Sequence, residues 1–162
     1  MNIPVGNIVE KRVSFEKTAA DKKVTQLLNS NFSGYMVATA EGITGIEEAI
    51  LLILGREIIG AVFEAISINK TFYGLQGLRL SLNLLKAKKG VFDVNALTKQ
   101  QIDLIIAFNE KIALLHPVGI DIFLKLLPAV YRPGTVLELL KADLSKTEQR
   151  EKILKRFGLG SI

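Results

Sequence analysis

The side chain best suited to proton transfer near neutral pH is His116, the single histidine among 162 residues. An unperturbed imidazole titrates close to neutrality, which makes histidine the usual first candidate for a general base. His116 directly precedes Pro117, where the apolar pattern predicts that a helix ends, and a histidine at that place complements the last helical carbonyls. We therefore interpret His116 as structural. Without cysteine in the chain, it would need at least two carboxylate ligands to form a zinc site.

Two pairs of carboxylates have spacings that merit attention as acid and base. Glu47 and Glu48 are adjacent in a predicted strand, where neighbouring side chains point to opposite faces of the sheet. Asp103 and Glu110 are seven residues apart in a predicted helix, which places both on one face. Charged residues on a helix face are usually solvated. Neither pair is therefore predicted to act in catalysis or to bind a metal.

Two glycine-containing segments suggest phosphate loops, but neither has the required context. Gly55-Arg56-Glu57 is predicted to join two strands, whereas a phosphate loop leads from a strand into a helix. The second segment, residues 74–77 with Gly74 and Gly77, lies inside a predicted helix and lacks the Lys-Ser/Thr pair. The sequence thus predicts no catalytic residue, no cofactor and no metal, and we expect a protein that is not an enzyme.

Composition restricts the remaining classes. Hydrophobic residues make up 49% of the chain and the mean hydropathy is +0.32, yet charges interrupt every window long enough to span a membrane. The first residues lack the basic-then-apolar order of a secretory signal. We expect a cytoplasmic protein without membrane contact.

The net charge of +5 comes entirely from the second half of the chain. Residues 1–85 carry 8 basic and 8 acidic groups, and residues 86–162 carry 13 basic and 8 acidic groups. The predicted basic patch consists of Lys86, Lys88, Lys89, Lys152, Lys155 and Arg156. Such a surplus permits binding to nucleic acid through its phosphates, which is the alternative function we consider.

The elements that position these residues are predicted from hydrophobic periodicity. Strands are expected over residues 33–42, 46–54 and 58–66, joined as an antiparallel meander with a turn at Gly55. A short strand is expected over residues 90–94, and residues 3–15 could form a strand or an extended arm. Helices are expected over residues 16–29, 70–88, 98–115, 118–127, 135–140 and 145–156. The fold class is therefore α+β: a small antiparallel β-meander packed against helices, with a helical C-terminal region.

The predicted helix over residues 70–88 is apolar around most of its circumference. Such a helix is either central in the core or part of a subunit interface. We assign Leu80, Leu84, Gly74 and Gly77 to an interface, since small residues allow close approach and leucines supply apolar area. This pattern favours a homodimer or another protein partner, although a monomer whose C-terminal helices cover the second face of the sheet would explain it as well.

The order of motifs resembles a known type of module. FSGYMVATAEG, a strand ending in LGREIIGAVFEA, the helix YGLQGLRLSLNLL and the strand KKGVFDV are together similar to PATAN-like (PatA N-terminal-like) domains of signalling proteins. With IPVGNIVEKRVSFE at the start, the chain resembles uncharacterised archaeal proteins that carry such a module, over about residues 3–115. The resemblance implies an interaction or regulatory role and no catalytic residues.

These observations predict a PATAN-like module over residues 1–116 and a helical extension over residues 117–162 packed on it. The function we expect is a non-enzymatic protein–protein interaction or regulatory, signalling module.

Overall fold

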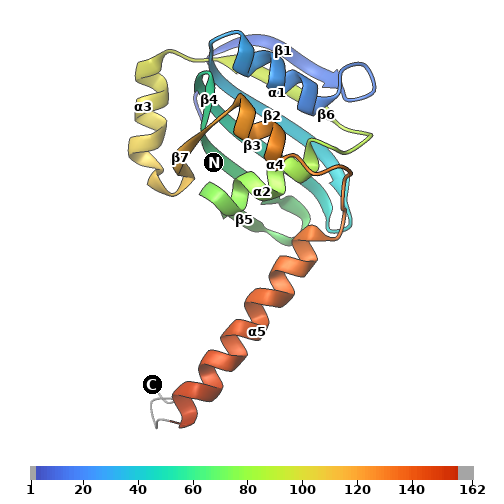
Figure 1. The fold of residues 1–162 in the computed structure, drawn as a ribbon, viewed down its shortest axis with the longest axis vertical. Helices are drawn as coiled ribbons and strands as arrows, with labels where there is room; N and C mark the ends of the chain where they lie inside the picture. Colours follow the sequence, from blue (N-terminus) through green and yellow to red (C-terminus); the bar gives the residue numbers. More distant parts are fainter. Residues whose placement is uncertain (1–2, 157–162) are drawn as a thin grey trace. The chain divides into compact units, whose positions relative to one another are not determined.

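The computed structural model describes residues 3–156, without the side chains of residues 153–155. The described residues divide into two compact units, with the boundary between Arg132 and Pro133. The first unit contains the whole sheet and the helices that pack on it (Figure 1). The second contains one helix, α5 (Thr135–Arg156). The predicted boundary at residue 116 falls inside a strand of the first unit.

The sheet is antiparallel throughout and has the order β1-β6-β2-β3-β4-β5, with β7 pairing on β4 as well. The strands are β1 (Asn7–Ser14), β2 (Phe32–Gly42), β3 (Gly45–Gly55), β4 (Glu57–Ala65), β5 (Lys70–Tyr73), β6 (Val91–Ala96) and β7 (Ala113–Gly119). The meander β2-β3-β4 was predicted. Gly55 forms its second turn with φ +67°, a conformation that glycine adopts at little cost.

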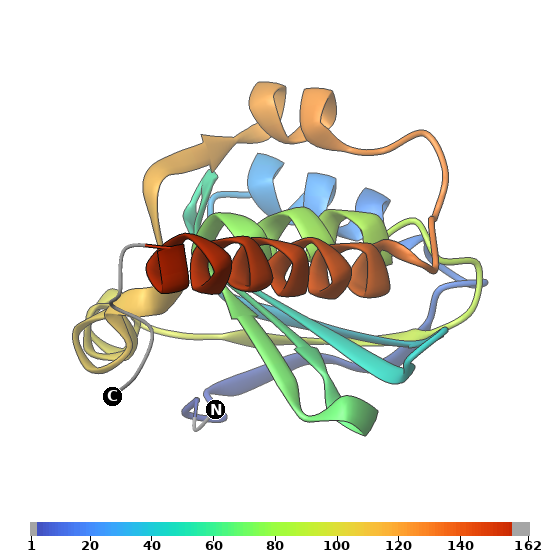
Figure 2. The same ribbon diagram turned by 90° about the horizontal axis from the view of Figure 1, so that it is seen from below.

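Three helices lie on one face of the sheet: α1 (Ala20–Asn29), α2 (Gly74–Leu84) and α4 (Ile120–Leu126) (Figure 2). They cover strand residues such as Met36, Leu51, Phe63 and Phe92, which are almost fully buried. The alternation of side chains along a strand sends the intervening residues to the other face. There α3 (Lys99–Phe108) packs Ile102 and Ile105 against a cluster that includes Tyr35, Ile50, Leu52 and Val62.

Only part of this second face is covered. Ile50 and Leu52 of β3 are buried beneath α3, whereas Glu48, further along β3, and Thr39 opposite it on β2 remain partly exposed. Helix α3 therefore covers only the half of this second face that carries Ile50 and Leu52.

The strand β1 is at one edge of the sheet and pairs with β6 alone. Its register shifts twice, between Ile8 and Glu10 and between Glu10 and Val13. Arg12 has φ +51° within the second irregularity, and its backbone N–H donates to the carboxylate of Asp93 at 2.5 Å. The outer edge of β1 is therefore bent instead of straight.

The prediction of one helix over residues 70–88 is wrong at its start. Residues Lys70–Tyr73 form β5, which extends the sheet by pairing with β4 from Val62 to Ala65. The helix α2 begins only at Gly74, whose φ of +57° marks the change of direction. Pairing with an available strand edge outweighs the helical spacing of Phe72 with the leucines that follow.

The helix predicted over residues 98–115 is also too long. Its beginning is confirmed, because Thr98 and Gln101 form a capping box at the start of α3. The helix ends at Phe108, however, and is followed by a single 3-10 turn over Glu110–Ile112 and by β7. The strand pairs with β4 through Gly60 and Ala113, so a tertiary partner decides the conformation of this apolar segment.

Helix α5 replaces two predicted short helices with one of 22 residues. Ser145 does not start a new helix there, since its hydroxyl donates to the carbonyl of Ala142 within the same helix. Serine in mid-helix commonly makes this local bond, so its type alone does not indicate a helix start.

Candidate functional site

The residues considered for catalysis do not come together. His116 is exposed and belongs to the strand β7, so the prediction that it lies at a helix end is wrong. Asp103 is exposed on α3 and forms an ion pair with Lys99 at 2.7 Å. Within residues 3–156 no group of three or more His, Asp or Glu side chains is placed to bind a metal ion.

Glu47 and Glu48 point to opposite faces of the sheet, as the strand prediction requires. Glu47 is 2% exposed and accepts hydrogen bonds from the hydroxyls of Thr44 at 2.9 Å and Tyr131 at 3.5 Å. Burial raises the pKa of Glu47 above its ordinary value, and the two hydroxyl donors oppose that rise. Burial and the nearby Glu47 carboxylate raise the pKa of Tyr131 to about 12. This pair therefore fixes the segment around Tyr131 on the sheet.

A second pair of carboxylates, Glu48 and Glu64, was missed by reasoning from the sequence. The two residues are directly opposite each other on β3 and β4. Burial raises the pKa of Glu48, and the charge of Glu64 raises it further, while the Thr39 hydroxyl donates to Glu48 at 3.4 Å and opposes the rise. The turn at Gly55-Arg56-Glu57 alone does not predict this pair, because the pairs next to it are Leu54 with Glu57 and Ile53 with Ile58. A register shift between Leu52 and Ile53 moves the later pairs by one residue, so that Glu48 meets Glu64, and the sequence carries no signal for that shift.

The residues predicted to form an interface are all on the buried side of α2. Leu80 is 1% exposed, Leu84 is fully buried, and Gly74 and Gly77 are buried as well. At Gly77 a Cβ atom would lie 2.7 Å from the carbonyl oxygen of Phe72 and 3.0 Å from that of Ala61, so this glycine allows α2 to approach the strands. The dimer stays a prediction, but these four residues are not an accessible surface for it.

The basic patch predicted from the sequence divides between the two units. Lys86, Lys88 and Lys89 follow the C-terminus of α2 and line a hollow of about 690 Å³ together with Glu41, Ala87, Ala129, Val130 and Tyr131. We call this feature the lysine hollow. Lys152 and Arg156 are exposed on α5, and the side chain of Lys155 lies outside the described residues.

The lysine hollow has walls that hydrogen bonds hold in place. On one side, Lys86 forms an ion pair with Asp21 of α1 at 2.9 Å. On the other, Tyr131 bonds to Glu47, and the side-chain amide of Asn83 both donates to the carbonyl of Arg132 at 2.8 Å and accepts from its N–H at 2.9 Å. The shape of the hollow is therefore set without a ligand.

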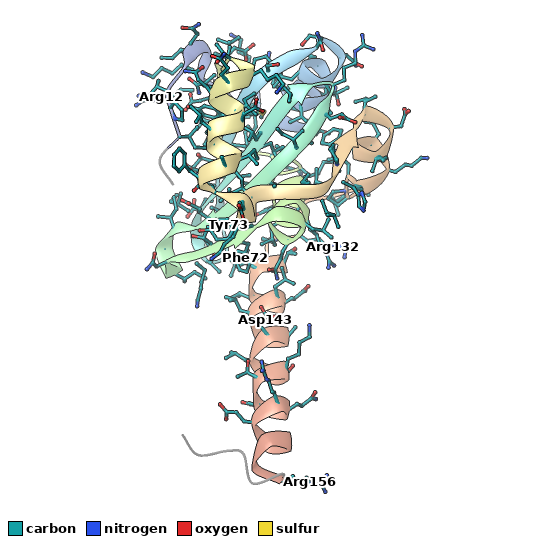
Figure 3. The ribbon with its side chains drawn as sticks, turned by 90° about the vertical axis from the view of Figure 1, so that its left-hand side faces the viewer. Arg12, Phe72, Tyr73, Arg132, Asp143 and Arg156 are labelled. Carbon is teal, nitrogen blue, oxygen red and sulfur yellow. The ribbon has the colours of Figure 1, made fainter. Side chains whose placement is uncertain are left out.

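A group of exposed apolar side chains surrounds the end of α3. Leu104 and Phe108 are one helical turn apart and 56% and 83% exposed. Tyr73 is 40% exposed and shares a hollow of about 450 Å³ with Asn109, the residue after α3. Figure 3 shows α3 on the side facing the viewer, with Tyr73 below it. We call Leu104, Phe108 and Tyr73 the α3 surface.

The geometry thus defines an α+β module with two candidate binding features, the lysine hollow and the α3 surface. Residues 1–109 match the model of a family described as an uncharacterized protein conserved in archaea, DUF2226. The chain belongs to this family, which confirms the resemblance to archaeal proteins seen in the sequence. Searches of curated proteins and of solved structures returned no match.

Within the described residues, no helix combines the length and apolar character needed to cross a membrane.

Proposed function

We propose that this protein is a non-enzymatic interaction module that binds a second copy of itself through the α3 surface. The supporting observation is that α3 has apolar residues on two sides. Ile102 and Ile105 face the sheet and are buried, whereas Leu104 and Phe108 face solvent. A helix on the surface of a monomer ordinarily presents polar residues outward, and an apolar outer side is typical of an interface.

The charges around α3 favour a second copy as the partner. No charged residue occurs from Leu104 to Asn109, while Lys99 and Asp103 precede this stretch and Glu110 and Lys111 follow it. If two α3 helices pack antiparallel about a two-fold axis near residue 106, Leu104 of one copy meets Phe108 of the other. The same axis brings Lys99 and Asp103 of one copy toward Glu110 and Lys111 of the other. This surface is therefore complementary to itself.

A regulatory role for the module is part of the proposal. It rests on the resemblance of the segments FSGYMVATAEG and KKGVFDV to PATAN-like domains of signalling proteins. In the structure these segments form β2 and the start of β6, which pair with each other in the middle of the sheet. Their residues support the fold and supply no reacting group, which suits a module that acts by binding.

Light scattering over a concentration series tests the dimer. We expect a dimer for the natural chain. Phe108→Glu should weaken association at least about tenfold, because truncating a buried aromatic anchor of an interface typically costs about 2 kcal/mol or more and a tenfold change needs about 1.4 kcal/mol. Phe108 is 83% exposed, so the substitution should leave folding intact.

Leu124→Glu is the matched control, since Leu124 is 52% exposed on α4, away from the α3 surface. A strict monomer at every concentration would contradict the self-association. A dimer that Phe108→Glu leaves unchanged would show that a different surface forms it.

A further inference from the structure

The lysine hollow is lined by free cationic groups and by small apolar side chains. Lys86 is already paired with Asp21, but among the described residues no carboxylate lies within ion-pair distance of Lys88 or Lys89. Both lysines are exposed at the rim. Ala87, Ala129 and Val130 line the same hollow, and Val130 is 63% exposed. An occupant that satisfies all of these groups must carry negative charge beside an aliphatic group.

The lysines are held near each other by the backbone of their turn. Ala87 N–H donates to the carbonyl of Leu84 at 2.9 Å, and the carbonyl of Gly90 accepts from Phe15 N–H at 3.0 Å. The opposite wall is fixed by Tyr131 and by the two bonds between Asn83 and Arg132. A site whose backbone is ordered beforehand loses less entropy when a ligand binds. The volume of about 690 Å³ is within the range of ordinary binding pockets.

We infer that the lysine hollow binds an acidic segment of another protein, with carboxylates on Lys88 and Lys89 and an aliphatic side chain against Ala87, Ala129 and Val130. This site is separate from the α3 surface, so the inference goes beyond the proposed self-association. It assigns the module a partner of a different kind: a peptide segment rich in Asp or Glu with an aliphatic residue beside the acidic ones.

Nucleic acid suits the hollow less well for two reasons. Glu41 lines it, so a uniform polyanion meets repulsion there, whereas a peptide can place a neutral residue at that point. Single-stranded nucleic acid is also held by stacking of bases on exposed aromatic rings. The one aromatic residue that lines the hollow is Tyr131, which is half-buried with its hydroxyl bonded to Glu47.

The test uses fluorescence anisotropy with the full chain and three labelled probes. The first probe is a peptide of four Glu-Glu-Leu repeats, the second is a peptide of four Glu-Glu-Gly repeats, and the third is a twelve-nucleotide oligothymidine. We expect the leucine peptide to bind most tightly and the glycine peptide to bind several-fold more weakly. The double variant K88E/K89E should weaken binding of the leucine peptide about tenfold or more, because two attractive pairs become repulsive.

The double variant K11E/K70E is the matched control. It changes the net charge equally, and both lysines are exposed and do not line the hollow. We expect this control to retain binding of the leucine peptide within about threefold, since distant exposed charges are screened.

A third variant, Val130→Ser, distinguishes a specific site with an apolar contact from general electrostatic attraction of acidic peptides. It should weaken binding of the leucine peptide and leave the glycine peptide unchanged. Equal losses in K88E/K89E and K11E/K70E would overturn the inference, as would no binding of the leucine peptide. Tighter binding of the oligothymidine than of either peptide, lost in K88E/K89E, would assign the hollow to nucleic acid instead. The Phe108→Glu variant should bind the leucine peptide normally, so a failure of self-association is distinguishable from a failure at this site.

Discussion

Replacing Gly77 with alanine should destabilise the protein, although alanine is the better helix former. In the middle of an exposed helix this substitution gains about 1 kcal/mol. At Gly77, however, the new Cβ would lie 2.7 Å from the carbonyl oxygen of Phe72 and 3.0 Å from that of Ala61. Both contacts are with backbone atoms of the sheet, which cannot turn away as a flexible side chain can.

The net effect follows from two opposing contributions. Overpacking a tight core typically costs about 1–3 kcal/mol, and contacts with backbone carbonyls belong at the upper end of that range. Subtracting the gain in helix propensity leaves a destabilisation of about 2 kcal/mol. For a protein of this size, 2 kcal/mol lowers the melting temperature by about 4–8 °C.

Urea and thermal denaturation, followed by circular dichroism at one fixed protein concentration, measure this change. Gln76→Ala is the control, because Gln76 is the exposed neighbour in the same helix and should change stability by less than about 0.5 kcal/mol. If Gly77→Ala proves as stable as the natural chain or more stable, the close approach of α2 to the sheet does not constrain this position. If it alters only the molar mass in solution, Gly77 belongs to an interface after all.

Three further predictions concern the capping box, the buried carboxylate and the core. Thr98→Ala removes the hydroxyl that accepts from Gln101 N–H at 3.2 Å and should cost about 1 kcal/mol in urea denaturation; an unchanged midpoint would show that the capping box does not contribute. Glu47 has a raised pKa, so the folded state binds its proton more tightly than the unfolded state does, and stability falls as pH rises from the ordinary carboxyl pKa to the folded value. Glu47→Gln should therefore remove this fall, so that the slope of unfolding free energy against pH in the acid range is more positive than in the natural chain, and an identical slope in both proteins would refute this. Phe92→Ala should cost about 3–5 kcal/mol, because Phe92 is 1% exposed and stacks on Phe15; a loss below 1 kcal/mol in the same assay would contradict its place in the core.

The parts of the fold that sequence reasoning predicted are those with strong local signals. The turn at Gly55 with apolar runs on both sides predicts the β3-β4 hairpin, and the Thr98 and Gln101 pair predicts where α3 begins. Each of these depends on residues close in sequence.

The errors occur where a distant strand edge determines the conformation. Both β5 and β7 lie in segments that have helix-like spacing, and both become extended because the outer edge of β4 is available to them. Where Phe108 ends the helix, no proline or glycine follows to mark the change.

The candidate sites were less predictable than the fold. The lysines after α2 were identified as a basic group, but the hollow also needs residues 129–131, which are about 40 residues later in the chain. Leu80 and Leu84 were assigned to an interface because their helix has apolar residues around most of its circumference. That pattern cannot distinguish a core helix from an interface helix. The exposure of Leu104 and Phe108 could not be predicted, because every residue from Leu104 to Phe108 is apolar and the pattern does not show which side chains face solvent.

The irregular edge of β1 has a consequence for how the protein behaves at high concentration. A straight edge strand offers a row of unpaired N–H and C=O groups to any extended chain, which is the first step toward fibrils. Two register shifts and the positive φ of Arg12 interrupt that row, and the charges of Lys11 and Arg12 sit at the same place. The bend therefore protects a chain with a mean hydropathy of +0.32 from aggregation by edge-to-edge stacking.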